Sequence, residues 1–474
     1  MSARLINHKK LPINLGDRAF RKTALALAVP IALQNMLSAS FSLVDTLMVG
    51  QLGEVALSSV GMAAQWSWLM TMVIFGISSG AAVFVSQYWG DKNIRGIHKT
   101  LGIAVLSAAV ISAVFALVAA LFSETVISVF NRDAAVIANG SVYLRYACLS
   151  YPAIALTGVL SSVLRSTERV RLPMVVSGIS TVLNAAVNYL LIFPAGLGVK
   201  GAAIATVISS WTGLALIVII SLVRKNILIG RASDIFAIKS AELREFFRRA
   251  APVMFNETMW GLGTVTYSAI FANLGYEQYA AITIVRTFEN ISFCFFIGLC
   301  ESCCVMIGKS VGSGQIREAI RDTKRFFILM SIVSAAVGIS VICLRGTLVS
   351  IFNLGQQVSP ATLDIAKNIL IIYGAWISVR NVPYLSVVGI FRPGGDTTTG
   401  MKWEIVILWL FALPVTFVAA HVIHLPFLAV YAIMYLCEDL PKGIVFLRHY
   451  ASGKWIKPVT ESGRAALTEF EAQE

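Results

Sequence analysis

Asp45 is a carboxylate inside the first long apolar stretch of a 474-residue sequence. Burying an ionisable group in such a stretch is costly, so it usually faces a partner or a polar pathway. The fifth stretch adds Asn184 and Asn188, which are four residues apart and so share one face of a helix. Tyr143 and Thr206 place hydroxyl groups at a similar depth. These side chains offer the oxygen ligands that a hard cation takes, and a buried carboxylate can also carry a proton, so we expect a cation-binding site.

Each of these polar side chains also has a simpler interpretation. Polar residues in membrane helices more often form hydrogen bonds between helices than bind ions. Asp45 taken alone can lie at the outer end of its helix, where it reaches the interface or caps a neighbouring helix. The joint placement of several oxygen-bearing groups is what favours the cation site.

The later apolar stretches carry a different set of polar residues. Glu257 lies in the seventh stretch, Arg286 and Glu289 lie in the eighth, and Arg380 and Asn381 lie in the tenth. Arg286, Glu289 and Arg380 can pair with one another, whereas Glu257 can attract a cationic substrate. We treat this set as a candidate substrate or polar site of the second half.

The sequence around these residues indicates a membrane protein. Hydrophobic residues make up 57% of the chain, charged residues make up 13%, and the mean hydropathy is +0.77. A water-soluble domain of this length needs far more polar surface, so most side chains must meet lipid. The apolar stretches are continuous and about 20 residues long or longer, which favours helices over a closed barrel of alternating residues.

Twelve such stretches can be counted, and the positions of Lys and Arg orient them. The predicted spans are 23–50, 60–88, 101–122, 140–163, 173–193, 201–223, 250–274, 279–308, 326–344, 362–391, 403–420 and 425–447. With the N-terminus inside, the inside segments hold about ten times as many Lys and Arg residues as the outside loops, which hold only Arg132, Lys200 and Arg345. We therefore expect a multi-pass protein of the cell inner (plasma) membrane with both termini in the cytoplasm.

The two halves of the sequence repeat each other at a constant offset, so that Pro30 pairs with Pro252 and Gly76 with Gly298. Six spans per half is an even number, so the halves share one orientation and are related by an axis along the membrane normal. We predict an all-α polytopic fold with twelve transmembrane helices in two parallel-related six-helix lobes around a central cavity. The predicted segments are a cytoplasmic N-terminal segment (1–22), an N-lobe (23–223), a cytoplasmic linker (224–249), a C-lobe (250–447) and a cytoplasmic tail (448–474).

Sequence motifs of other functions are missing. No Gly-rich loop ends in the Lys-Ser/Thr pair that binds nucleotide phosphates, which argues against a built-in ATP-driven pump. The five histidines form no metal-ligand pattern, and the seven cysteines all fall in apolar stretches. The net charge of +13 mostly reflects the cytoplasmic loops. We therefore expect no enzyme activity, no organic cofactor, no metal beyond Na+ at the cation site, and no nucleic-acid partner.

The segment from Pro30 through Asp45 to Gly50 resembles the multidrug and toxic compound extrusion (MATE) family. Further points of similarity are Gly90, Leu164 with Arg165, residues 184–193 and residues 198–206. The resemblance extends over the whole chain and is most specific in the first lobe. It implies an exporter of amphipathic, often cationic, drug-like organic compounds that works by alternating access and is driven by inward flow of Na+ or H+.

The same resemblance implies roles for matching positions. It places the cation site on Asp45, Tyr143, Asn184, Asn188 and Thr206, and the bend of the first helix at Pro30. Glu257 fits an acidic position of the NorM branch, but Asn381 stands where that branch has an aspartate, which argues against a second-lobe sodium site. Asn188 stands where several relatives have an aspartate, and the missing charge favours protons over sodium. The coupling ion and the choice between the NorM and DinF branches stay open.

Two other functions also stay open. A flippase of lipid-linked saccharides needs a cationic cavity, for which Arg145, Arg286 and Arg380 are candidates. A non-transporting scaffold or a channel would also account for twelve spans and an internal repeat. For the transporter we expect small organic substrates and membrane lipid as partners, and a monomeric state.

Overall fold

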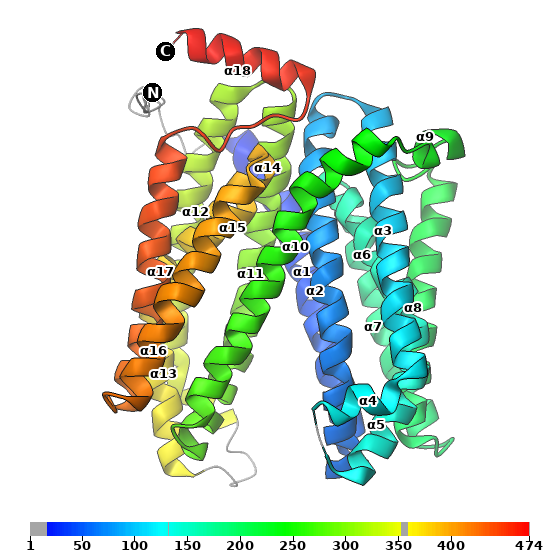
Figure 1. Ribbon diagram of the computed structural model, residues 1–474, viewed down its shortest axis with the longest axis vertical. Helices are drawn as coiled ribbons and strands as arrows, with labels where there is room; N and C mark the ends of the chain where they lie inside the picture. Colours follow the sequence, from blue (N-terminus) through cyan, green and yellow to red (C-terminus); the bar gives the residue numbers. More distant parts are fainter. Residues whose placement is uncertain (1–16, 131, 352–358, 474) are drawn as a thin grey trace. The chain divides into compact units, whose positions relative to one another are not determined.

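The computed structural model describes residues 17–130, 132–351 and 359–473, and these residues are predominantly helical (Figure 1). Within these ranges, the only strand-like pairing is an isolated bridge between Gly395 and Ile456. The predicted all-α class is therefore confirmed. The prediction succeeded because long apolar segments can satisfy their backbone groups in lipid only by hydrogen bonding within a helix.

The first six predicted spans are all helical. They are α1 (Arg18–Gly50), α2 (Glu54–Gly90), α3 (Ile94–Leu121), α5 and α6 (Ala134–Ala147 and Tyr151–Ser166, joined by a 3-10 turn), α7 (Arg171–Ile192) and α8 (Gly198–Val223). The connections include the short helices α4 (Ser123–Ser128) and α9 (Ala232–Phe236). The predicted linker 224–249 thus contains α9 and the beginning of the next long helix.

The later predicted spans are helical as well. They are α10 (Ser240–Ala272), α11 (Tyr276–Gly312), α12 (Ile316–Ile351), α13 and α14 (Pro360–Tyr384 and Arg392–Gly394, joined by the π-helix Leu385–Phe391), α15 and α16 (Thr397–Ile407 and Leu413–His421, joined by the π-helix Leu408–Ala412) and α17 (Phe427–Ala451). A final helix, α18 (Glu461–Gln473), lies in the predicted tail.

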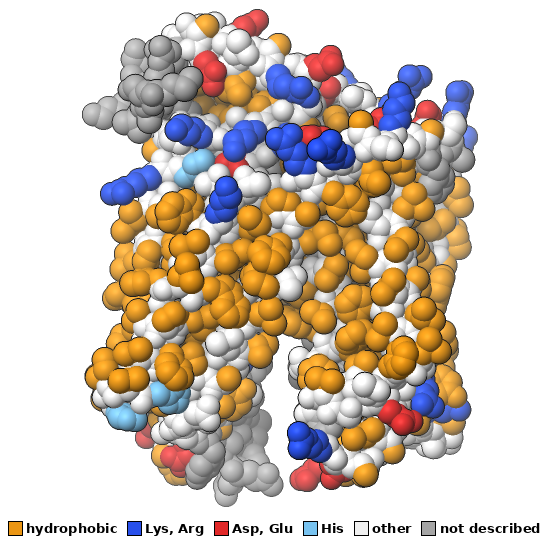
Figure 2. Space-filling view, in the orientation of Figure 1, with side chains coloured by type: hydrophobic (Ala, Val, Ile, Leu, Met, Phe, Trp, Pro, Cys, Tyr) orange, Lys and Arg blue, Asp and Glu red, His pale blue; other side chains and the backbone are white. Residues whose placement is uncertain are grey.

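Helix length and composition support a multi-pass membrane protein. Among the described residues, ten helical segments are long and apolar enough to cross a membrane. The remaining two predicted spans, α10 and α17, are of similar length but carry more charged residues. Figure 2 shows hydrophobic side chains along the middle of the helices and Lys and Arg side chains near helix ends. Such an apolar exterior is expected where the solvent is lipid.

The helices pack into two compact units. The N-unit comprises residues 33–254, and the C-unit comprises residues 1–32 together with 255–474. The chain passes between the units within α1, after Ala32, and within α10, after Met254. Each passage follows a proline of the repeat, Pro30 or Pro252, by two residues. These unit boundaries describe packing, whereas the predicted lobe and linker boundaries describe where the chain enters and leaves the membrane. The predicted boundaries stay a prediction.

The internal repeat is visible in the helices themselves. α1, α2 and α3 begin at residues 18, 54 and 94, and α10, α11 and α12 begin at residues 240, 276 and 316, so each pair has the same offset as the repeated prolines. In the N-unit, a Cβ atom on Gly76 of α2 would lie 2.6 Å from the Cα of Met254 in α10. In the C-unit, a Cβ atom on Gly298 of α11 would lie 2.6 Å from the carbonyl oxygen of Ala28 in α1. The repeated glycines therefore allow a close helix crossing in each unit.

Candidate functional site

The five residues of the predicted cation site all lie in the N-unit, on four helices. α1 carries Asp45, α5 carries Tyr143, α7 carries Asn184 and Asn188, and α8 carries Thr206. We call these five residues the N-unit polar cluster. The structure brings them together, and their individual contacts show what the cluster can bind.

Hydrogen bonds connect α1, α7 and α8 through side-chain amides. Asn188 Nδ2 donates to Asp45 Oδ1 over 2.7 Å and to Asn184 Oδ1 over 3.1 Å. Asn184 Nδ2 in turn donates to Ser209 Oγ over 3.4 Å. Both asparagines are buried, with exposures of 1% or less. Ser209 was missed by the sequence analysis, although it lies three residues after Thr206 on the same helix.

The hydroxyl groups complete the cluster. Thr206 Oγ1 donates to the carbonyl oxygen of Ala202 over 3.1 Å, so the lone pairs of this oxygen are left to accept a bond or bind a cation. Tyr143 is buried, and its hydroxyl lies close enough to Thr206 and Asp45 to interact with both. Carboxylate, amide and hydroxyl oxygens therefore converge from four helices.

The cluster contains acceptor oxygens without matching donors. Asn188 Oδ1 has no hydrogen-bond partner among the described residues, although Asn188 is fully buried. Rotating this amide would place its oxygen against the carboxylate of Asp45, so the contact with Asp45 defines the orientation. None of the ion pairs found in the described part of the chain involves Asp45. A half-buried carboxylate beside an unpartnered amide oxygen is suited to hold a proton or a small cation.

Pro30, the predicted bend of the first helix, lies inside α1. α1 is continuous from Arg18 to Gly50, and the proline precedes the passage into the N-unit by two residues. A proline within a helix removes one backbone hydrogen bond and so permits a bend. The bend between transport states stays a prediction.

Glu257 of the second candidate set is held in an ion pair within the C-unit. Its Oε1 lies 2.5 Å from Nη2 of Arg392, and the Arg392 side chain is almost completely buried. The sequence analysis placed Arg392 in a cytoplasmic segment and did not pair it with Glu257. The π-helix Leu385–Phe391 directly precedes Arg392 and changes the face of the helix on which this side chain lies.

Arg380 and Glu289 lie near each other, as the pairing interpretation expects. The distance from Arg380 Nη1 to Glu289 Oε1 is 3.8 Å, and Arg380 Nη1 donates to the hydroxyl of Tyr435 over 2.9 Å. Tyr435 and Tyr431 donate to Glu289 Oε1 over 2.8 Å and 3.1 Å. Hydrogen bonds with the two α17 tyrosines therefore stabilise the charges of Glu289 and Arg380.

The other two members of the second set have separate partners. Arg286 Nη2 donates to Ser268 Oγ over 2.8 Å, and Asn381 Nδ2 donates to Ser334 Oγ over 2.8 Å. The five candidates of the second half are thus spread over several contacts within the C-unit, and they do not form one shared hydrogen-bond network among the described residues.

Three charged residues of α17 were missed by the sequence analysis. Lys442 Nζ lies 2.7 Å from Glu438 Oε1 and 3.9 Å from Glu404 Oε1, and Trp376 Nε1 donates to Asp439 Oδ2 over 3.1 Å. The sequence could have revealed these three residues, because ionisable residues within an apolar span usually mark functional positions.

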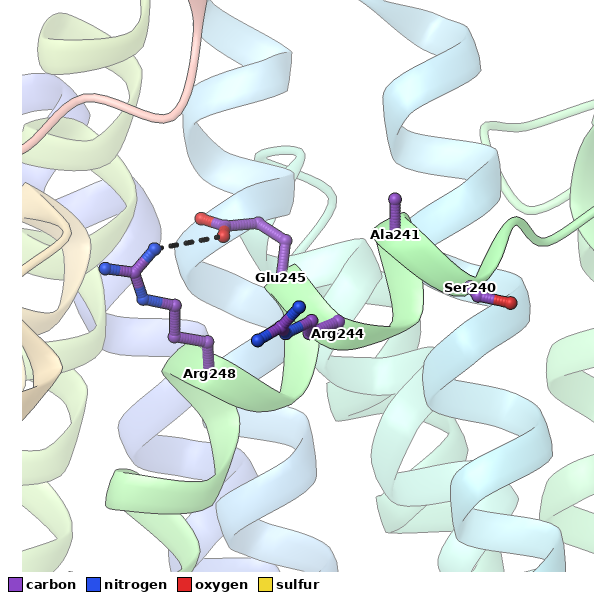
Figure 3. A pocket seen from close by; sticks show the side chains of 5 residues that line it. All are labelled: Ser240, Ala241, Arg244, Glu245 and Arg248. Atoms are coloured by element: carbon purple, nitrogen blue, oxygen red, sulfur yellow. Dashed lines mark ion pairs between the residues drawn. The ribbon is translucent and has the colours of Figure 1, made fainter.

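A surface hollow at the beginning of α10 is lined by none of the polar residues described above. It is lined by Ser240, Ala241, Arg244, Glu245 and Arg248, and Figure 3 shows the ion pair between Glu245 and Arg248, whose N–O distance is 3.8 Å. All five residues come from the first turns of one helix. The hollow is therefore an open surface feature without polar groups converging from several helices.

Comparison with known proteins covers nearly the whole chain. The family model described as MatE matches residues 30–190 and 252–418. The chain is 24% identical over 466 residues to the "Probable multidrug resistance protein NorM" of Thermotoga maritima, and the match covers 96% of each chain. It is 22% identical to "Multidrug and toxin extrusion protein 1" of Oryctolagus cuniculus, over 92% of this chain and 76% of the relative.

Solved structures show the same likeness. The chain resembles the MATE transporter VcmN of Vibrio cholerae in its bent form with a TM-score of 0.83 and 17% sequence identity. The match covers 93% of this chain and 99% of the other. This likeness supports the predicted fold class of twelve membrane-spanning helices in two six-helix lobes.

Proposed function

Because this chain belongs to the MatE family of membrane transporters, we propose that it is a secondary active transporter that exports amphipathic, cationic organic compounds. Export is driven by an inward-moving cation that binds at the N-unit polar cluster. The observation that carries the proposal is the carboxylate of Asp45, which has no basic partner among the described residues and lies beside an unpartnered oxygen of Asn188. Such a carboxylate is more stable in lipid once a cation or proton neutralises it.

In the proposed cycle, Asp45 takes up the cation from the outside while the transporter is open outward. Neutralisation of Asp45 changes the packing of α1, and Pro30 allows this helix to bend. Affinity for the organic substrate falls in that state, so the substrate leaves, and the cation is later released to the cytoplasm. The cation can drive the cycle only because it binds the two conformations with different affinities.

The coupling ion is H+ or Na+. The pair of Asp45 with the neutral Asn188 gives the cluster one negative charge instead of two, and a small charge count favours a proton over a metal ion. No organic cofactor enters this mechanism. We assign the protein to the inner (plasma) membrane as a monomer with both termini cytoplasmic, in contact with lipid. The charge distribution of the loops supports this orientation.

The contacts of the arginines weigh against a flippase of lipid-linked saccharides. Arg145 Nη2 lies 3.0 Å from Glu124 Oε1, and Arg380 lies 3.8 Å from Glu289. Two of the three candidate arginines therefore already face acidic partners, and Arg286 donates to Ser268. A cavity that holds a pyrophosphate needs basic groups whose charge is not already compensated.

The test is efflux of a cationic dye, ethidium, from proteoliposomes under separately imposed sodium and proton gradients. We expect Asp45→Asn to insert and fold but to lose gradient-driven efflux, because an amide cannot be protonated or neutralise a cation. The control is Asp364→Asn, which removes a largely exposed carboxylate paired with Lys367. Efflux by Asp45→Asn at the wild-type rate under both gradients would refute the assigned role of Asp45.

A further inference from the structure

Three carboxylates and one lysine lie close together in the C-unit. Lys442, Glu438 and Asp439 lie on α17 and Glu404 lies on α15, and we call these four residues the α17 cluster. Lys442 is 3% exposed and Asp439 is 6% exposed. Ionised carboxylates within a spanning segment are costly unless each one is matched by a cation or a proton.

The ammonium of Lys442 is committed to two of these carboxylates. Its Nζ lies 2.7 Å from Glu438 Oε1 and 3.9 Å from Glu404 Oε1. Asp439 instead accepts a hydrogen bond from Trp376 Nε1 over 3.1 Å, and none of the ion pairs in the described part of the chain involves Asp439. One positive charge therefore serves three acidic groups.

The neighbouring helices do not supply the missing charge. Groups that face the cluster are Tyr267 from α10, Glu289 from α11, Arg380 from α13, Arg392 after the π-helix, and Tyr435 and Cys437 from α17. Arg380 already lies near Glu289, and Arg392 is paired with Glu257. With these two pairs neutral overall and its own four residues ionised, the α17 cluster carries three negative charges and one positive charge, an excess of two.

Two buried polar groups beside the cluster are unsatisfied. Asn256 Nδ2 donates to Glu404 Oε2 over 2.7 Å, while Asn256 Oδ1 has no partner in the described residues. The hydroxyl of Tyr267 lies beside Glu438 and Asp439 without a well-formed hydrogen bond to either. Asn256 and Tyr267 are 3% and 7% exposed. Asn256 thus repeats the N-unit arrangement, in which an amide donates to a carboxylate and leaves its oxygen unpartnered.

The repeat relates this place to the N-unit polar cluster. At the offset that pairs Pro30 with Pro252, Tyr267 of α10 corresponds to Asp45 of α1. α17 is the last span of its half, as α8 is in the first half. The C-unit therefore has a hydroxyl where the N-unit has its carboxylate, and the nearby carboxylates come from the last span.

We propose that Asp439 is a second proton-binding carboxyl of this transporter, located in the C-unit and separate from Asp45. A proton from water adds to one carboxylate oxygen and gives a neutral carboxyl, and the same proton is later returned to water. Lys442 already occupies the position between Glu438 and Glu404 that a metal ion would need, whereas a proton needs no additional space. The proposal rests on the transport function proposed above.

Proton release on substrate binding tests this assignment. Ethidium is added to the purified full chain in a weakly buffered detergent solution that contains a pH indicator. We expect Asp45→Asn and Asp439→Asn each to release one proton fewer per bound dye than the wild type, and Asp364→Asn to match the wild type. If only Asp45→Asn changes the count, the proposed function stands and the role of Asp439 is refuted.

Infrared difference spectra between acidic and alkaline pH test the protonation of Asp439 without requiring transport. We expect a carbonyl band of a protonated carboxyl that is present in the wild type and in Asp45→Asn and is lost in Asp439→Asn. Asp439→Glu keeps the carboxyl and should show the band at a shifted frequency. This second variant keeps the assignment testable if Asp439→Asn does not fold. An Asp439→Asn spectrum identical to that of the wild type overturns the proposal, even if dye binding and efflux fail altogether.

Discussion

Removing the guanidinium group of Arg392 tests how strongly the C-unit depends on its buried pair with Glu257. The Arg392 side chain is 4% exposed, the Glu257 side chain is 14% exposed, and their closest N–O distance is 2.5 Å. At an effective dielectric constant near 20, unit charges about 2.5–4 Å apart attract each other by roughly 4–7 kcal/mol. Most of this attraction offsets the cost of removing both charges from water. Arg392→Met strands the carboxylate, so we expect the free energy of unfolding to fall by about 3–5 kcal/mol.

The assay is reversible denaturation in mixed detergent micelles, followed by tryptophan fluorescence. Arg448→Met on α17 is the control, because Arg448 is exposed and its loss should change the free energy of unfolding by no more than about 0.5 kcal/mol. Adding Glu257→Gln to Arg392→Met removes the stranded charge and should recover most of the loss. The reasoning is refuted if Arg392→Met costs no more than Arg448→Met, or if the double variant is as unstable as the single one.

Two further predictions concern the N-unit. Gly76→Ala should lower the unfolding temperature, because its Cβ would meet the Met254 backbone, at a cost of about 1–3 kcal/mol; Gly61→Ala on the same helix meets open space and should be neutral or stabilising. Burial alone would raise the pKa of Glu242. The hydrogen bond and charge of Lys99, together with the backbone amide of Lys239, lower this pKa by a larger amount, so the net shift is downward. This contribution to stability is present above the unfolded pKa of about 4.3 and is lost as the pH falls through the lower folded pKa. Glu242→Gln should therefore reduce the unfolding temperature at neutral pH but not in strong acid, and an equal effect at both pH values would contradict the assignment.

The N-unit polar cluster was predictable because its signals are local and isolated. Asn184 and Asn188 are one helical turn apart, and Asp45 is the single acidic residue of its span. Few other ionisable side chains lie within the spans of this half. The contact between Asp45 and Asn188 follows from these constraints, whereas the unpartnered oxygen of Asn188 depends on side-chain orientation and is visible only in the structure.

The C-unit contacts were less predictable, because two π-helices break the helical periodicity. A π-helix shifts the register, so residues after Phe391 no longer lie on the face that a period of 3.6 residues predicts. Arg392 was placed in a loop because the predicted span ends at residue 391, although its side chain pairs with Glu257, which lies 135 residues earlier. Glu438, Asp439 and Lys442 carried a readable signal, but their partners come from other helices, and sequence spacing alone does not identify them.

The internal repeat explains why the two halves share a backbone and still differ in chemistry. Close crossings at Gly76 and Gly298 depend on backbone approach, so a side chain at either position would separate the helices. The polar positions have no such constraint, and Asp45 in one half corresponds to Tyr267 in the other. The C-unit thus lacks a carboxylate at the position that corresponds to Asp45. A carboxylate on its last span replaces that function only if the C-unit still binds a positive charge beside Tyr267. The α17 cluster carries such carboxylates beside Tyr267, which is the pattern expected if proton binding was retained while its residues were exchanged between helices.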